Sequence, residues 1–507
     1  MMFRKWLLFI FILLSCTCYG KAKDFNILNY GAKTAMGFNN APAIQAAINA
    51  ASAAGGGRVL VPVGRFTTGP IELRSGVELH VSSGAELLGS THRLDYGKEW
   101  ITALIFARGQ SSIALSGSGI VNGQGREVVK DLISLLHDGI LQDETWSFKR
   151  PSERNRPRLI AFTDCDKVSI KQITLKNSAG WVQDFVGCNG VNIDSIRVES
   201  TEYWNNDGID IVNSRDVRIT NCDIDAADDG ICLKSEGKPG ICENVYVENC
   251  VIRSSASGFK LGTGSFGGFR NIMVRNITVY NTYRSAIALE AVDGGFIENV
   301  DIADVKVKYS GNAIFIRLGH RNQDERYSSI KNIRISKLTA EIPNEKPDAG
   351  YPIEGPLPKV AAHNLIPASI TGLPGHNVEN VVIEDISIIY GGGALKSVAN
   401  IPIDKIDSIP ENPANYPEFS MFGELPCWAI YLRHVKGVTL NNVRFSYKKE
   451  DFRPAIVLDD VQAAVFKNVE VKSGVNIPVL VQKNCSQVTL KSIKLPFKSD
   501  KAIMIKD

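Results

Sequence analysis

Four stretches of the chain repeat one short pattern: VSIKQITL at 168–175, VNIDSIRV at 191–198, VRITNCDI at 217–224 and VYVENCVI at 245–252. In each stretch, apolar residues alternate with polar ones on both sides of a turn residue, which indicates short, half-buried strands. The four copies begin 23, 26 and 28 residues apart, and further copies begin at Ile272, Val300, Ile333, Val381, Val438 and, more weakly, Val488.

A unit of about three short strands cannot bury its apolar face alone, so successive units must stack and hydrogen-bond to one another. A β-propeller is the competing repeat fold, but its blades contain about 40–45 residues and four strands. The shorter period therefore predicts an all-β fold, a single-chain right-handed parallel β-helix. Asparagines recur at the turns (Asn221, Asn249, Asn276 and Asn299). They could adopt the left-handed conformation of a tight bend or form an amide ladder, and both interpretations are structural.

An Ala-rich segment at 41–53 precedes the repeats and predicts a short helix that caps the open end of the solenoid. The Gly55-Gly56-Gly57 that follows lacks the Lys-Ser/Thr of a phosphate-binding loop, so we interpret it as a turn. We expect an N-terminal cap with the first coils over 21–100 and the main β-helix over 101–507. Proline-rich stretches predict loop insertions near 343–376 and 396–428.

Residues 1–20 have the pattern of an export signal, with Arg4 and Lys5 before an apolar run that is too short to cross a bilayer comfortably. Cys16 lies in a sequence similar to a lipoprotein box, so lipid anchoring is a further hypothesis. No later segment is long and apolar enough to be a transmembrane helix. Without Arg4 and Lys5, 55 basic residues face 54 acidic ones, counted from 57 and 54 in the full chain. This balance argues against a nucleic-acid partner.

Eight of the ten cysteines lie beyond the export signal, and none forms a CxxC pair. Cys165 and Cys188 occupy matching positions in successive repeats. We interpret them as a stack of small buried residues, with a disulfide bridge as the alternative.

Aspartates gather in two adjacent repeats. Asp207 lies in Asn205-Asn206-Asp207-Gly208-Ile209-Asp210, and the next repeat contains Ala226-Ala227-Asp228-Asp229-Gly230-Ile231. Asp207 and Asp228 are 21 residues apart, close to one coil, so we expect Asp207, Asp228 and Asp229 to share one patch. Crowded carboxylates raise at least one pKa, and a protonated acid beside ionised neighbours is what glycoside hydrolysis requires. Turn formation and a calcium site are the alternative interpretations.

The chain resembles glycoside hydrolase family 28, the polygalacturonases and rhamnogalacturonan hydrolases, over nearly its whole mature length. The resemblance is carried by Asn29-Tyr30-Gly31-Ala32, Gly56-Gly57-Arg58-Val59, Pro62-Val63-Gly64, Trp181, Asn206 to Asp210, Asp228-Asp229, Tyr416-Pro417-Glu418 and Arg433-His434-Val435. It implies an inverting mechanism in which Asp228 is the general acid. Asp207 and Asp229 would then hold and deprotonate the attacking water, with acid and base about 6.5–9.5 Å apart.

Two family motifs are altered. The family's Gly-His-Gly corresponds to Ala256-Ser257-Gly258, and its substrate-gripping Arg-Ile-Lys corresponds to Ala286-Ile287-Ala288. The resemblance therefore implies retained chemistry with altered specificity. Candidate substrate-binding residues are Asp210, Lys260, Arg284, Glu290 and Trp204. Arg270, Trp181 and Tyr203 are weaker candidates, and for each of the three basic residues a solvated surface charge is the structural alternative.

The leading hypothesis is an exported, monomeric hydrolase of galacturonic-acid-containing linkages in pectin, with no cofactor and no metal. A calcium-dependent pectic lyase and a non-catalytic carbohydrate-binding solenoid are the alternatives. The substrate partner would be a pectic polysaccharide or oligosaccharide.

Overall fold

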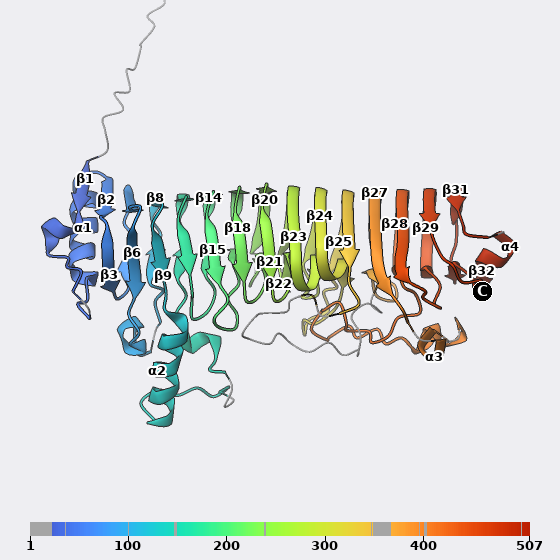
Figure 1. The fold of residues 1–507 in the computed structure, drawn as a ribbon, viewed down its shortest axis with the longest axis horizontal. Helices are drawn as coiled ribbons and strands as arrows, with labels where there is room; N and C mark the ends of the chain where they lie inside the picture. The colour runs from blue at the N-terminus through green and yellow to red at the C-terminus, as the bar shows by residue number, and fades with distance from the viewer. Residues whose placement is uncertain are drawn as a thin grey trace, which may run out of the picture.

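The computed structural model describes residues 23–506 except 36, 100, 147–149, 238–239, 346, 348–366, 395, 400–402 and 498. The predicted export signal at 1–20, including Cys16, lies outside the described residues. The strands wind into an elongated solenoid whose coils stack along its long axis (Figure 1). All pairings between its strands are parallel, which confirms the predicted parallel β-helix.

Three parallel sheets run along the solenoid, and each is formed by corresponding strands of successive coils. The first, here called the site sheet, contains the C-terminal parts of β23 (Gly268–Ala291) and β24 (Phe296–Leu318), the first parts of β28 (Ile430–Lys449) and β29 (Ile456–Val471), and β4 (Ile71–Glu72), β7 (Ile105–Arg108), β10 (Ile160–Thr163), β13 (Gln183–Val186), β16 (Ile209–Val212), β19 (Ile231–Ser235), β22 (Phe259–Ser265), β26 (Ala368–Thr371), β30 (Leu480–Lys483) and β32 (Ile503–Lys506).

The second sheet contains the first parts of β23 and β24, the later parts of β28 and β29, and β1 (Asp24–Asn26), β2 (Gly57–Val61), β5 (Val77–Val81), β8 (Ser111–Ser116), β11 (Asp166–Lys171), β14 (Asn189–Asp194), β17 (Arg215–Thr220), β20 (Ile241–Glu248), β25 (Ser329–Ile342), β27 (Val378–Gly392) and β31 (Thr489–Lys494). The third contains β3 (Gly64–Thr68), β6 (Ala85–Gly89), β9 (Ile120–Asn122), β12 (Thr174–Lys176), β15 (Arg197–Ser200), β18 (Asp223–Ala226) and β21 (Val251–Ser254), followed by the middle of β23.

The core is one continuous apolar column inside the coils. In β16, Ile209 and Ile211 point inward and are completely buried, while Asp210 and Val212 alternate with them on the outer side. Each inward residue lies on its counterpart in the next coil, as Ile209 does on Ile231. Strand alternation therefore decides which residues of the site sheet face the outside.

The turn asparagines adopt the left-handed conformation and also form amide ladders, the two interpretations that the sequence allows. Asn221, Asn249, Asn276 and Asn299 all have positive φ, between 47° and 57°. The Nδ2 of Asn249 donates to Oδ1 of Asn221 at 3.1 Å, and Asn276 donates to Asn249 at 2.8 Å. These amide ladders keep successive coils in register at the corner. Cys165 and Cys188 are both buried, as the stacking interpretation predicts.

The predicted cap is α1 (Ala41–Ala53), which packs against β1, β2, β4 and β5 at one end of the solenoid (Figure 1). It buries Ile44, Ala47 and Ile48. The glycines that follow it form a turn: Gly56 has φ 120°, and a Cβ at this position would lie 2.8 Å from the carbonyl oxygen of Gly76. α4 (Ser499–Ala502) lies at the opposite end of the chain (Figure 1). The short 3-10 helices are η1 (Ile27–Tyr30), η2 (Arg93–Tyr96), η3 (Glu153–Asn155) and η5 (Ile403–Ser408).

Two projections leave the solenoid on the same side (Figure 1). One contains α2 (Gly125–His137), an amphipathic helix that the repeat pattern did not predict and that buries Val128, Val129 and Leu132. The other contains α3 (Lys396–Ala399), η5 and the segment that leads to β28. The first predicted insertion, 343–376, is too long: residues 368–371 form β26, which pairs with β24 and β28 within the site sheet.

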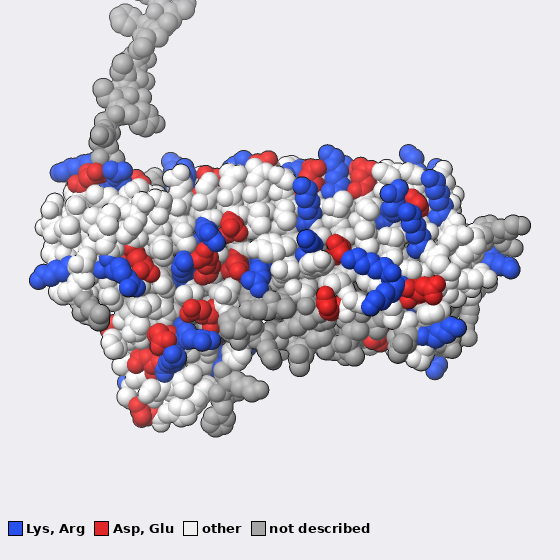
Figure 2. Space-filling view, viewed as in Figure 1, with Lys and Arg blue, Asp and Glu red and all other residues white. Residues whose placement is uncertain are grey.

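None of the helices in the described part of the chain is long and apolar enough to cross a membrane. On the face shown in Figure 2, acidic and basic side chains are interspersed rather than segregated by sign. This distribution agrees with the balanced charge of the sequence.

Candidate active site

Asp207 and Asp229 are neighbours across one coil of the site sheet. Ile209 pairs with Ile231, and the backbone N–H of Gly208 donates to the carbonyl oxygen of Asp229 at 2.9 Å. The coil offset here is therefore 22 residues, one more than the spacing between Asp207 and Asp228, and Asp207 lies against Asp229.

Asp228 lies at the turn before β19 and is half-buried. Its Oδ1 accepts from the backbone N–H of Asp229 at 3.0 Å, and its Oδ2 accepts from Nδ2 of Asn205 at 3.3 Å. Burial, reinforced by the negative charges of Asp207 and Asp229, raises the pKa of Asp228 to about 7. This carboxyl group can therefore carry a proton near neutral pH.

Two buried lysines neutralise the other carboxylates. Lys234 Nζ lies 3.0 Å from Oδ2 of Asp207 and also donates to Asp210. Lys260 Nζ lies 2.9 Å from Oδ2 of Asp229. In both pairs the carboxylate comes from one coil and the lysine from the strand of the next, β19 or β22.

The pKa of Asp229 is lowered in spite of its burial, because Lys260, Arg284 and Lys234 favour its charged form. Burial lowers the pKa of each lysine, but the surrounding carboxylates outweigh it and hold both values well above normal. The site therefore places a carboxyl group with a raised pKa, Asp228, directly beside one with a lowered pKa.

Two further acids lie on the outer side of the site sheet. Glu290 on β23 is buried, and its Oε2 lies 3.8 Å from Lys260 Nζ. Burial raises the pKa of Glu290 to about 7 and that of Asp184, on β13, to about 6. Asp184 is ion-paired with Arg158.

A cavity of about 250 Å³ opens over the three aspartates. It is lined by Glu153, Trp181, Asn205, Asp207, Asp228, Asp229, Lys234, Glu236, Lys260, Thr263, Gly264, Phe266, Arg321 and Tyr416. The sequence-based reasoning missed Lys234 and gave Tyr416 no role. Outward alternation on β19 could have indicated Lys234, whereas Tyr416 lies too far along the chain for any repeat argument to place it.

The predicted substrate-binding residues are divided between the cavity and its surroundings. Lys260 lines the cavity, although it is buried and bound to Asp229 rather than being the solvated surface charge we considered. Asp210 and Glu290 are buried beside the lysines and are not among the lining residues.

Trp204 also lies outside the lining, with its ring facing Arg150 and Tyr203. Arg284 is partly exposed, and its guanidinium carbon lies 5.7 Å from the centre of the Tyr416 ring. Arg270 lies away from the site, between Glu243 and Glu298.

Ligand atoms of Asp207, Asp229 and Cys232 lie within 4.8 Å of one another, a spacing that a metal ion could bridge. The ammonium groups of Lys234 and Lys260 already bind two of these three residues. A cation added between the carboxylates would be repelled by both ammonium groups, so this donor set fits a divalent ion poorly.

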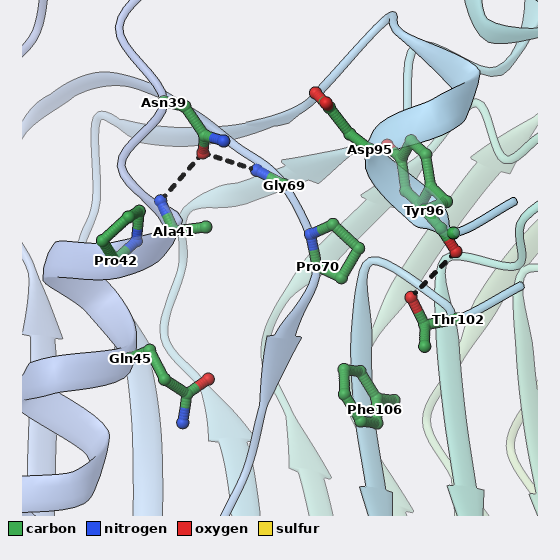
Figure 3. Close-up of a pocket in the computed structure, with 11 residues that line it drawn as sticks. Asn39, Ala41, Pro42, Gln45, Gly69, Pro70, Asp95, Tyr96, Thr102 and Phe106 are labelled. Atoms are coloured by element: carbon green, nitrogen blue, oxygen red, sulfur yellow. Dashed lines mark hydrogen bonds between the residues drawn. The ribbon is translucent and has the colours of Figure 1, made fainter.

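A larger hollow of about 520 Å³ lies beside α1, lined by Asn39, Gln45, Tyr96, Phe106 and neighbouring residues (Figure 3). Its polar groups serve the fold: Oδ1 of Asn39 accepts from the backbone N–H groups of Ala41 and Gly69. Among the lining residues that the structure describes, Asp95 is the only carboxylate, and it accepts from Ser90. It therefore lacks the paired acids that the cavity over Asp228 contains.

Comparisons with known proteins agree with this geometry. Residues 52–346 match the family model for glycosyl hydrolases family 28. The chain is 26% identical over 322 residues to an exo-poly-alpha-D-galacturonosidase of Dickeya chrysanthemi, covering 54% of this chain and 53% of that protein. It is 23% identical to a polygalacturonase of Nicotiana tabacum, covering 76% and 90% of the two chains. The chain spans about half the length of the first of these relatives.

Solved structures show the same fold. An exopolygalacturonase from Thermotoga maritima superimposes with a TM-score of 0.55 and 24% identity, covering 73% of this chain and 88% of that one. A family 28 exopolygalacturonase from Yersinia enterocolitica gives a TM-score of 0.56 at 16% identity, covering 94% and 79%.

Proposed function

Since the chain belongs to glycosyl hydrolases family 28, we propose that it hydrolyses galacturonic-acid-containing linkages in pectin, of the polygalacturonan or rhamnogalacturonan type. The observation that carries this proposal is the pairing of Asp228, whose pKa is raised to about 7, with Asp229, whose pKa is lowered. A protonated acid beside an ionised base is the arrangement that glycoside hydrolysis uses.

In this proposal Asp228 protonates the glycosidic oxygen as the bond to the leaving sugar breaks. Asp229 and Asp207 hold a water molecule and take its proton as the water attacks the anomeric carbon from the opposite face. The ion pair of Asp229 with Lys260 keeps the base ionised while the acid next to it carries a proton. Attack from the opposite face inverts the anomeric configuration.

Substrate recognition is a second part of the proposal. The family's Arg-Ile-Lys is absent, and Lys234, Lys260, Arg158 and Arg321 are each paired with a carboxylate. Among the described residues, Arg284 has no carboxylate within ion-pairing distance, and its buried Nε has no hydrogen-bond partner. We assign Arg284 the substrate carboxylate, with Lys260 and Glu290 supporting the site from below and Trp204 at its margin.

The calcium-dependent lyase alternative is not favoured, because ammonium groups already bind the carboxylates that would have to hold the ion. A non-catalytic solenoid would not need an acid with a raised pKa beside a base with a lowered one. We further propose that the protein is exported and acts as a monomer; lipid attachment through Cys16 remains a prediction from the sequence.

The test is incubation with a panel of polygalacturonan and rhamnogalacturonan fragments. New reducing ends without ultraviolet absorbance indicate hydrolysis, whereas an unsaturated, absorbing product indicates a lyase. Nuclear magnetic resonance of the first product gives its anomeric configuration. Retained configuration would contradict the assigned roles, and the absence of any product from every fragment would contradict the proposed function.

A further inference from the structure

Tyr416 reaches the active site from a distant part of the chain. It belongs to the segment 409–428, which precedes β28, whereas the aspartates lie near β16 and β19. Its hydroxyl oxygen nevertheless accepts from Lys260 Nζ at 3.2 Å, across 156 residues of sequence. Its ring lines the same cavity as Asp228. Tyr416 also lies outside the residues that match the family model.

The ring of Tyr416 is unusually accessible for an aromatic residue in a charged cavity, with 48% of the residue's surface exposed. Two cationic groups lie close to the ring: Lys260 Nζ is 5.5 Å and the Arg284 guanidinium carbon is 5.7 Å from its centre. Trp181, another aromatic residue of the lining, already has Arg158 and Lys234 at 4.3 and 4.1 Å from its ring centre. Tyr416 therefore offers the cavity an open aromatic surface.

The segment that carries Tyr416 is firmly attached to the solenoid. Glu411 accepts from Arg433 at 2.6 Å and bonds to His434 at 3.0 Å, and the carbonyl oxygen of Pro413 accepts from the backbone N–H of His320 at 2.8 Å. On both sides of Tyr416, apolar residues of the segment and of the preceding η5 cluster with outward residues of the site sheet: Ile406, Ile409, Phe419, Met421, Phe422 and Leu425 with Phe315, Tyr431, Val457 and Val481. The ring is thus held in position before any ligand arrives.

We propose that Tyr416 is a substrate-binding residue with two separable roles. Its ring packs against the C–H face of a pyranose unit next to the bond that is cleaved, because that face of a sugar is apolar and the ring is exposed and fixed. Its hydroxyl group positions Lys260, and through Lys260 the carboxylate of Asp229. The inference rests on the proposed function, since it requires a saccharide in the cavity.

Two variants separate the roles. Tyr416→Phe keeps the ring and removes the hydroxyl, whereas Tyr416→Ala removes both. We expect Tyr416→Phe to lower kcat with little change in KM, and to shift the acidic limb of the pH–rate profile because Lys260 no longer holds Asp229 as firmly. We expect Tyr416→Ala to raise KM about tenfold in addition. Tyr309→Ala is the matched control, since Tyr309 is also exposed and has Lys308 Nζ at 5.4 Å from its ring centre.

Binding is measured separately by calorimetry with trigalacturonate in the Asp228→Asn background. Tighter binding by Asp228→Asn than by Asp228→Asn/Tyr416→Ala supports the ring's role, and equal binding by both overturns it. A pH profile of Tyr416→Phe identical to that of the wild type overturns the positioning role. If Asp228→Asn binds no saccharide and the wild type cleaves none, the proposed function fails and this inference with it. Matching thermal melts show that each variant folds.

Discussion

Lys260 Nζ lies 2.9 Å from Oδ2 of Asp229, and both side chains are buried. The same relationship recurs one coil earlier, where Lys234 Nζ lies 3.0 Å from Oδ2 of Asp207. Each carboxylate at the start of a strand is thus neutralised by a lysine on the following strand of the site sheet. The ion pair is thus repeated from one coil to the next, whereas Asp228 pairs with neither lysine and its pKa is raised.

Asp228→Asn should abolish most of the turnover, because the amide cannot give a proton to the leaving oxygen. Removing a general acid typically costs about 10²–10⁴-fold in rate, and we expect a loss of that size in the release of reducing ends. Asp225→Asn is the control, since Asp225 lies on the third sheet, pairs there with Arg253 and has no catalytic role in our scheme. Activity of Asp228→Asn within threefold of the wild type would contradict the assignment.

Lys260→Met should destabilise the protein, because it leaves the buried carboxylate of Asp229 without its ammonium partner. Breaking a buried ion pair from one side costs about 3–5 kcal/mol, which a thermal melt detects. The double variant Asp229→Asn/Lys260→Met should regain much of this stability. Arg65→Met removes a partner from the exposed pair with Glu86 and should change stability by less than about 1 kcal/mol. Equal melting temperatures for Lys260→Met and the wild type would refute the expectation.

The pH dependence follows from the raised pKa of Asp228. Since the acid must be protonated, kcat should fall as pH rises through about 7. The charge of Arg284 lowers this pKa, so Arg284→Gln should move the basic limb of the profile to higher pH, whereas Arg284→Lys should leave it near its original position. If the basic limb does not move in Arg284→Gln, the observed titration does not belong to Asp228.

The raised pKa of Glu290 predicts that the stability of the protein depends on pH. Burial raises its pKa to about 7 in the folded protein, above the value of about 4.3 for an exposed glutamate. Between these values the folded state holds a proton that the unfolded state releases, so its contribution to the free energy of unfolding declines as pH rises from about 4 to 7. Glu290→Gln, which cannot titrate, should flatten this part of the melting-temperature curve. An unchanged slope would show that another group is responsible.

Metal chelation should leave turnover unchanged, because Lys234 and Lys260 supply the positive charge between the carboxylates. The measurement is the rate of reducing-end release before and after dialysis against EDTA, with calcium added back in parallel. A loss of rate that calcium restores would favour the lyase alternative.

The sequence was sufficient to predict the solenoid, since alternation and period are local properties of the chain. It also located the aspartates, because residues in consecutive coils must be neighbours. The exact register could not be predicted from the sequence, because coil lengths vary. Only the pairing of Ile209 with Ile231 in the structure shows that Asp207 faces Asp229.

Burial of charges was harder to predict. Lys260 has the alternation of an outward residue, which normally means solvent, but it lies among Asp229, Glu290 and Tyr416 and is 2% exposed. Tyr416 could not be placed at all, because its position depends on a loop whose path is fixed by apolar contacts with coils far along the chain.

Through those contacts, the last coils support a residue of the active site that lies far from them along the chain. Val457 and Val481 support the segment that carries Tyr416, although β29 and β30 contribute no residue to the cavity. Trimming the C-terminal turns of the solenoid would leave the aspartates untouched and still deprive the cavity of one wall. The C-terminal coils therefore both complete the solenoid and hold one wall of the active-site cavity in place.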